Sequence, residues 1–111
     1  MNEATRPPTA FETRVYDATR MIPQGKVSTY RDLAAAIGCG SSRAVGQALR
    51  RNPFAPETPC HRVIRADLSS GGFSGAVAGP EVERKLHLLA LEGVAFDEGG
   101  RLADPSQVHR W

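Results

Sequence analysis

Apolar residues recur at helical spacing in four segments of the chain, and these positions predict its main elements. The predicted helices cover residues 11–22, 30–37, 42–51 and 80–91. In the first segment Phe11, Val15 and Ile22 fall on one apolar stripe, and Pro23 ends it. In the last segment Val82 begins a stripe of the same spacing. The pattern therefore predicts a mainly helical protein.

The second and third predicted helices are short and are joined by residues 38–40, an arrangement that resembles a helix-turn-helix. Thr29 and Asp32 have the spacing of a capping box at the start of the second helix, and Gly38 ends it. The third helix, beginning at Ser42, carries arginines on its polar side. A helical hairpin of the kind found in many small domains is the alternative interpretation.

Extended structure is predicted at two places in the second half of the chain. Val63 and Ile64 favour a short strand directly after Cys60. Residues 94–96 and 101–103 flank an Asp-Glu-Gly-Gly turn and predict a hairpin. The predicted fold class is therefore mainly α with a small β-hairpin, forming a winged-helix-like helix-turn-helix DNA-binding domain.

The length of the chain, 111 residues, suits a single compact domain. We predict a flexible tail over residues 1–9, where Pro7 and Pro8 favour an extended backbone, and one domain over residues 10–111. No apolar run has the length to cross a bilayer, and the first residues lack the apolar core of a signal peptide. We expect an intracellular protein, in the cytoplasm or nucleoid of a prokaryote or the nucleus of a eukaryote.

The two cysteines, Cys39 and Cys60, fit a reducing compartment as free thiols better than they fit a disulfide framework. Neither belongs to a Cys-x-x-Cys pair, and the chain has no His-x-x-x-His pair, so we expect no metal site. No sequence motif calls for a cofactor. Cys39 lies between two predicted helices and has no assigned chemistry.

Positive charge is concentrated in one stretch, although the net charge is only +2. Between residues 41 and 66 there are five arginines and a single acid, Glu57. The arginines are Arg43, Arg50, Arg51, Arg62 and Arg65. Such a patch suits contacts with phosphates. A solvated surface explains the charge equally well.

Cys60 is the residue whose surroundings indicate chemistry. A cysteine is a good nucleophile only as the thiolate, which basic neighbours such as His61 and Arg62 favour. Three prolines in the preceding segment place it on a stiff loop. A buried cysteine acting as a small apolar residue is the alternative. A hydrolytic cysteine enzyme would need a base and an orienting residue, and no local protease signature is present.

Around Cys60 the segment Pro59-Cys-His-Arg-Val-Ile64 resembles the active-site motif of the O6-alkylguanine-DNA alkyltransferases. Four further segments resemble the same family at the expected spacing, namely residues 25–30, 42–53, 72–75 and 85–93. The resemblance extends over residues 11–93 and concerns the catalytic, DNA-binding domain at the C-terminal end of the larger members. Their N-terminal domain, with any zinc it holds, has no counterpart in this sequence.

The resemblance implies a role for each residue that matches the motif. Cys60 is expected to accept the alkyl group irreversibly, so that one molecule repairs one lesion. His61 is expected to keep Cys60 ionised through a water, with Glu92 orienting the imidazole. Asn52 is expected to hold the helix-turn-helix and the active-site loop together. Tyr30 is expected to rotate the nucleotide and to donate a proton near N3 of the base.

The resemblance also implies the DNA contacts. Arg43 is expected to enter the duplex in place of the flipped base. The other DNA-binding residues expected are Ser42, Tyr30, Arg50, Arg51 and Arg62. The base pocket is expected to include Val63, Phe73 and Ser74. The partner implied is double-stranded DNA containing O6-alkylguanine, bound by a monomer, and excision-repair proteins are a further candidate partner.

Departures from the family pattern leave alternatives open. Phe73 stands where a tyrosine is common, and the segment over residues 76–83 is longer than usual. The small size and the end at Trp111 resemble the alkyltransferase-like proteins, which bind the lesion without repairing it. Those proteins lack the acceptor cysteine, so Cys60 favours the enzyme. A winged-helix DNA-binding module without lesion chemistry is the third hypothesis, and it leaves the Pro-Cys-His-Arg motif unexplained.

Overall fold

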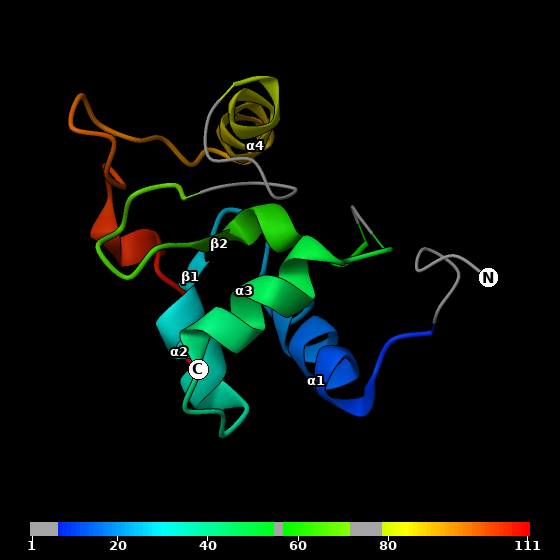
Figure 1. The fold of residues 1–111 in the computed structure, drawn as a ribbon. Helices are drawn as coiled ribbons and strands as arrows, with labels where there is room; N and C mark the ends of the chain where they lie inside the picture. Colours follow the sequence, from blue (N-terminus) through cyan, green and yellow to red (C-terminus); the bar gives the residue numbers. More distant parts are fainter. Residues whose placement is uncertain (1–6, 55–56, 72–78) are drawn as a thin grey trace.

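The computed structural model describes residues 7–54, 57–71 and 79–111. Its helices are α1 (Ala10–Thr19), α2 (Tyr30–Ala36), α3 (Ser42–Arg50) and α4 (Pro80–Leu91), with short 3-10 helices η2 (Cys60–Arg62) and η3 (Pro105–Gln107). The strands are β1 (Ser28–Thr29) and β2 (Val63–Ile64). Figure 1 shows α1, α2 and α3 gathered on one side of the two strands and α4 on the other. The mainly helical fold class is confirmed.

Helix α1 begins and ends for local reasons. The Thr9 side chain accepts from the Glu12 backbone amide, and the Glu12 side chain accepts from the Thr9 amide, which completes a capping box. The helix ends at Thr19, before the predicted end at Ile22, because the Ile22 amide donates to the Thr19 carbonyl in a tighter turn. Ile22 is nevertheless fully buried, as its place on the apolar stripe predicts.

The predicted helix-turn-helix is formed by α2 and α3. The Thr29 hydroxyl caps α2 by accepting from the Asp32 amide, and the Ser41 hydroxyl caps α3 by accepting from the Ala44 amide. Both helices pack with α1 around one apolar cluster, whose buried members include Val15, Tyr16, Ile22, Leu33, Ala34, Val45, Ala48, Leu49 and Val63. The arginine-bearing side of α3 is therefore left for solvent or a partner.

Strands β1 and β2 pair in parallel, Ser28 with Val63 and Thr29 with Ile64. Successive strand residues face opposite sides, so Val63 joins the cluster of α1, α2 and α3, whereas Ile64 joins a second cluster. The buried members of this second cluster are Val27, Ile64, Leu89, Val94 and Leu102. The strands thus join the helix-turn-helix to α4 and to the C-terminal segment.

The C-terminal segment contains the predicted hairpin, reduced to a single bridge between its two arms. Phe96 and Leu102 form one antiparallel bridge, and the Asp97 amide donates to the Arg101 carbonyl. Beyond it, Val108 pairs in parallel with Val27 beside β1, a pairing that the local pattern did not predict. Across the residues that the structure describes, no helix is long and apolar enough to cross a membrane.

Candidate active site

Cys60 lies at the start of a tight turn. Pro59 has φ −82° and ψ 68°, which is an inverse γ-turn, and the Cys60 amide donates to the Thr58 carbonyl at 2.8 Å. The 3-10 helix η2 follows at once, so a turn separates the cysteine from the predicted strand at Val63. Cys60 is half-buried and packs against the helical cluster. The turn fixes its backbone while leaving part of the side chain accessible.

Asn52 connects the end of α3 to the segment that carries Cys60. Its side-chain amide donates to the Thr58 carbonyl at 2.9 Å, and its side-chain oxygen accepts from the Phe54 amide at 2.9 Å. Thr58 is also the residue whose carbonyl binds the Cys60 amide. The end of α3 and the cysteine turn are therefore joined through Asn52 and Thr58.

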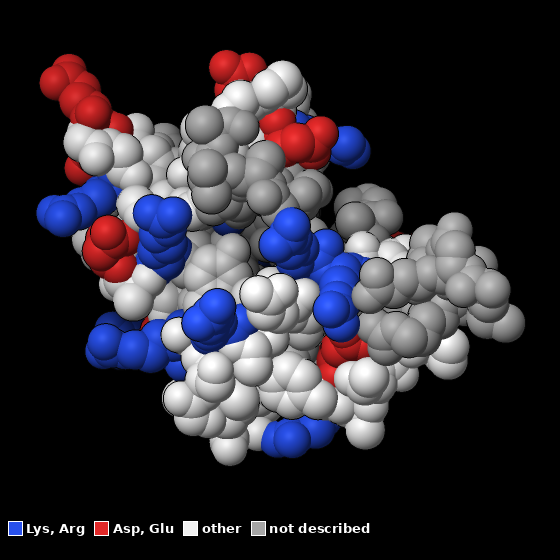
Figure 2. Space-filling model, in the orientation of Figure 1, with Lys and Arg blue, Asp and Glu red and all other residues white. Residues whose placement is uncertain are grey.

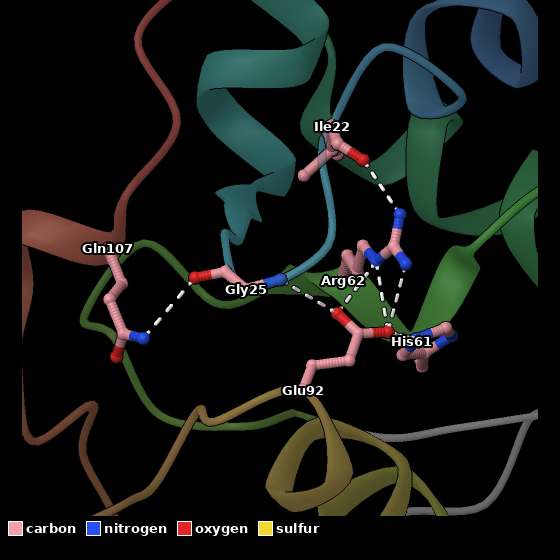
Figure 3. A network of polar contacts seen from close by, with 6 residues as sticks. All are labelled: Ile22, Gly25, His61, Arg62, Glu92 and Gln107. Carbon is pink, nitrogen blue, oxygen red and sulfur yellow. Dashed lines mark hydrogen bonds and ion pairs between the residues drawn. The ribbon is translucent and has the colours of Figure 1, made fainter.

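A carboxylate lies beside the residues that follow Cys60. Glu92, the residue after α4, accepts from His61 Nε2 at 2.7 Å and from the Arg62 guanidinium at 2.9 to 3.1 Å (Figure 3). The Gly25 amide donates to the same carboxylate at 3.1 Å. The side chains of His61 and Glu92 are 7% and 9% exposed, so water competes little with these contacts.

The Glu92 carboxyl is held in its ionised form. Burial raises its pKa, but the hydrogen bonds from Arg62, His61 and Gly25, together with the Arg62 charge, outweigh burial and lower the pKa below its ordinary value. An ionised carboxylate accepts hydrogen bonds and cannot donate one. His61 Nε2 must therefore carry the hydrogen, which leaves Nδ1 of a neutral His61 as an acceptor.

Lys85 and Tyr30 are two further residues near Cys60. Lys85 is fully buried and donates from Nζ to the Val63 carbonyl at 2.7 Å, with Nζ 6.0 Å from the centre of the Tyr30 ring. Burial lowers the pKa of Lys85 to about 8, opposed by the charge of Cys60. Burial and the Cys60 charge raise the pKa of Tyr30, while Arg65 opposes them. Tyr30 is thus kept as a phenol that can donate.

A shallow groove of about 330 Å³ follows the polar side of α3. Its lining residues are Tyr30, Ser42, Arg43, Gly46, Gln47, Arg50 and Arg65. Figure 2, in the orientation of Figure 1, shows arginine and lysine side chains spread over the face that carries α3. Tyr30 is the residue that the groove shares with the surroundings of Cys60. Tyr30 therefore lines the groove and lies close enough to Cys60 for the cysteine's charge to raise the Tyr30 pKa.

The structure brings together most of the expected site residues that it describes. Arg43, Arg50, Ser42 and Tyr30 share the groove, whereas Arg51 turns toward Glu12, 3.8 Å from its carboxylate. Arg62, expected on the DNA, is instead held by Glu92 and by the Ile22 carbonyl. Val63 contributes its carbonyl to Lys85. Phe73 and Ser74 lie outside the described residues.

Some residues of the site were not selected from the sequence. Arg65 was noted only as one of the arginines in the basic stretch, and the structure shows that it lines the groove. The contacts of Gly25 and Gln107 have no local signal, because they depend on folding of distant segments. No group of three or more histidine, cysteine, aspartate or glutamate side chains suitable for a metal occurs in the described part of the chain.

A basic groove on a helix-turn-helix, joined to a turn-borne cysteine, defines a DNA-binding protein with a candidate nucleophile. Comparison with known proteins specifies the class further. A family model described as the 6-O-methylguanine DNA methyltransferase DNA-binding domain matches residues 10–94. The chain belongs to this family of DNA repair proteins.

Curated relatives support the assignment. A methylated-DNA–protein-cysteine methyltransferase of Methanothermobacter thermautotrophicus is 44% identical over 89 residues, which are 80% of this chain and 47% of that protein. The constitutive enzyme of Bacillus subtilis is 40% identical over 91 residues, 81% of this chain and 53% of that protein. The chain thus spans about half the length of the curated relatives that it matches.

Solved structures resemble the chain in two ways. The O6-methylguanine-DNA methyltransferase of Pyrococcus kodakaraensis matches with a TM-score of 0.66 at 44% identity, covering 78% of this chain and 47% of that one. S. pombe Atl1, in complex with damaged DNA containing O6-carboxymethylguanine, matches with a TM-score of 0.75 at 32% identity, covering 96% of this chain and 100% of that one. The chain is therefore similar both to part of an enzyme and to the whole of a lesion-bound protein.

Proposed function

We propose that the protein repairs O6-alkylguanine in double-stranded DNA by transferring the alkyl group to Cys60. The observation that carries the proposal is the 2.7 Å contact between His61 Nε2 and Glu92, directly after a cysteine held on a tight turn. This contact leaves His61 Nδ1 as a base for the thiol, through a water where the two do not touch. The relatives named as cysteine methyltransferases support the same reaction.

In the proposed reaction His61 takes the thiol proton and the Cys60 sulfur attacks the alkyl carbon. A carbon–sulfur bond forms, the bond from that carbon to O6 breaks, and its electron pair stays on the guanine. Tyr30, a phenol with a raised pKa, then supplies a proton at N3. The proton that His61 took from the thiol then returns to Tyr30 through solvent, so no proton is gained or lost overall. The thioether is stable, which makes the reaction a single turnover.

The target base must leave the duplex before Cys60 can reach it, at a cost of a few kcal/mol. Arg43, near the start of α3 and lining the groove, is proposed to fill the space left in the base stack. Ser42, Arg50 and Arg65 line the same groove and are proposed to contact phosphates. Since phosphate contacts carry no sequence information, the lesion itself provides the specificity.

The test is the intact mass of the protein after incubation with a duplex containing O6-methylguanine. We expect a stoichiometric gain of a single methylene in the native chain and none in Cys60→Ala. Cys39→Ser is the matched control, because it removes the other thiol and should leave the gain unchanged. A native chain that gains no mass while binding the duplex would refute alkyl transfer.

A second candidate function is recognition of the lesion without repair, followed by recruitment of excision-repair proteins. The observation that favours it is the match to S. pombe Atl1 over all of that chain. Selective binding of the O6-methylguanine duplex with an unchanged protein mass would select this function. Equal affinity for damaged and undamaged duplexes would reject both candidates in favour of a plain DNA-binding module.

A further inference from the structure

All three side-chain nitrogens of Arg62 donate to protein groups. Its Nε lies 2.9 and 3.1 Å from the two Glu92 oxygens, and its Nη2 donates to Glu92 Oε2 at 3.0 Å. Its Nη1 donates to the Ile22 carbonyl at 2.8 Å. The side chain is 17% exposed. These contacts within the protein account for the position of the Arg62 guanidinium without a phosphate, so its place in the basic stretch has another explanation.

We propose that Arg62 is a positioning residue for the Cys60 thiol, acting through Glu92 and His61. By holding both carboxylate oxygens, Arg62 fixes the rotation of the carboxylate that receives the His61 Nε2 hydrogen. This inference rests on the proposed function, because it assigns Arg62 a part in the same chemistry.

The need for a clamp follows from the position of Glu92. Glu92 is the C-cap residue of α4, beyond the last full helical turn, and its terminal torsion is broad and roughly two-fold. Without Arg62, one neutral donor would remain at each oxygen, His61 at Oε2 and the Gly25 amide at Oε1, and neither donor reaches both oxygens. The forked guanidinium binds both oxygens in one plane, a geometry that the single ammonium of a lysine does not provide.

The hydrogen bonds that the two Glu92 oxygens accept determine which ring nitrogen of His61 carries a hydrogen. Oε1 accepts from Arg62 and from the Gly25 amide, and Oε2 accepts from Arg62 and His61. The positive charge that balances the buried carboxylate comes from Arg62. A neutral His61 that donates from Nε2 has its free lone pair on Nδ1. Arg62 thus keeps a proton acceptor available beside Cys60.

The Ile22 bond extends the clamp to the helix-turn-helix side of the molecule. Ile22 is fully buried in the cluster of α1, α2 and α3, so its carbonyl is a rigid anchor. Glu92 belongs to the α4 side. Arg62 therefore fixes the carboxylate relative to the same helices that carry the DNA groove.

The first test uses no DNA, which separates it from the proposed function. In a Cys39→Ser background, the rate of Cys60 alkylation by iodoacetamide is measured for the native Arg62, Arg62→Lys and Arg62→Gln. A positioned base contributes roughly 100-fold or more, so we expect Arg62→Gln to lose at least about 10-fold and Arg62→Lys to lose less. Arg101→Gln, which removes the same charge at an exposed position, should leave the rate unchanged.

The second test separates positioning from general support of the fold. The ¹⁵N resonances of His61 should show one tautomer, with hydrogen on Nε2, in the native chain and in Arg101→Gln. Arg62→Gln should lose this single-tautomer signature while keeping native affinity for an undamaged duplex. If Arg62→Gln does not fold, Arg62→Lys keeps the charge and serves for the same comparison.

Two outcomes would overturn the inference. An unchanged tautomer and unchanged thiol reactivity in folded Arg62→Gln would show that Glu92 and His61 do not depend on the clamp. Weakened duplex binding with normal reactivity would assign Arg62 to the DNA. A native chain that transfers no alkyl group from DNA would defeat the proposed function, but the iodoacetamide and tautomer results would still decide the role of Arg62.

Discussion

The side-chain amide of Gln107 donates to the Gly25 carbonyl at 3.2 Å, and the amide of that same Gly25 donates to Glu92 (Figure 3). Gln107 also donates to the Gly93 carbonyl at 3.1 Å, next to Glu92 in the chain. Gln107, in the C-terminal segment, thus holds the Gly25 loop, which donates to the Glu92 carboxylate, and the backbone of Gly93, which follows Glu92 in the chain. Gln107 lies beyond residues 10–94, where the family model matches.

Replacing Gln107 should therefore weaken both stability and thiol chemistry. Gln107→Ala removes two hydrogen bonds, each contributing about 1 kcal/mol, and we expect the free energy of unfolding to fall by about 1 to 2 kcal/mol. Gln107→Glu loses both donors while keeping most of the shape, so it should resemble the alanine variant. Urea denaturation and the iodoacetamide rate of Cys60 provide the measurements. Native values in Gln107→Glu would contradict the bracing role.

The buried Lys85 should make stability rise with pH. Its pKa is about 8 in the folded protein against 10.5 in the unfolded chain, so the unfolded chain binds more protons between these values. Well below pH 8 both states are protonated and the burial cost is fully present. Between pH 7 and pH 9 we expect the free energy of unfolding to increase by about 1 kcal/mol from this group, as Lys85 releases its proton.

Urea denaturation at the two pH values measures this effect. In Lys85→Met the increase should disappear, because no titrating ammonium remains. The chain's other lysine, Lys26, is the control, since Lys26→Met leaves the buried ammonium in place. The prediction fails if Lys85→Met keeps the pH dependence of the native chain.

Asn52 should couple DNA recognition to the cysteine turn. Asn52→Asp keeps the oxygen that binds the Phe54 amide but loses the donor to Thr58, whereas Asn52→Ala loses both. We expect Asn52→Asp to slow alkyl transfer from duplex DNA by about 10-fold, the equivalent of 1.4 kcal/mol, and Asn52→Ala to lower stability as well. Single-turnover rates and thermal unfolding distinguish the two. Equal rates for Asn52→Asp and the native chain would show that the hydrogen bond from Asn52 to Thr58 does not affect alkyl transfer.

The helices could be predicted because each is amphipathic within its own sequence. The predicted 80–91 helix has the bounds of α4, and α2 and α3 differ from prediction by a single residue. The end of α1 was misplaced because Ile22 continues the apolar stripe after the hydrogen bonding has tightened. The pairing of β1 with β2 was missed because two-residue strands have no readable period and their partners are distant in sequence.

For the candidate site, the sequence indicated Cys60 and His61 directly and Glu92 only through the resemblance. A count of charges does not reveal their partners, so the expectation that Arg62 contacts DNA did not include its hydrogen bonds to Glu92. The contact of Gln107 with Gly25 joins residues 82 positions apart and left no trace in the local pattern. The catalytic and DNA-binding roles of the site residues stay predictions.

The two arginines Arg43 and Arg51 should behave differently on DNA although both belong to the basic stretch. Arg43 lines the groove at the start of α3, whereas Arg51 lies 3.8 Å from the Glu12 carboxylate on the side of α1. We expect Arg43→Ala to slow transfer from duplex DNA by about 10-fold or more, because nothing then fills the base stack after flipping. Its iodoacetamide rate should stay native, since the thiol is untouched.

Arg51→Ala is the matched control for Arg43→Ala. We expect it to leave both the transfer rate and the salt dependence of duplex binding close to native, because Arg51 faces Glu12 and not the groove. Loss of a phosphate contact would instead reduce the salt slope by about 1. Binding to an O6-methylguanine duplex over a range of salt concentrations checks both variants. A reduced salt slope in Arg51→Ala would mean that Arg51 leaves Glu12 to reach a phosphate, and the DNA surface would then extend past the end of α3.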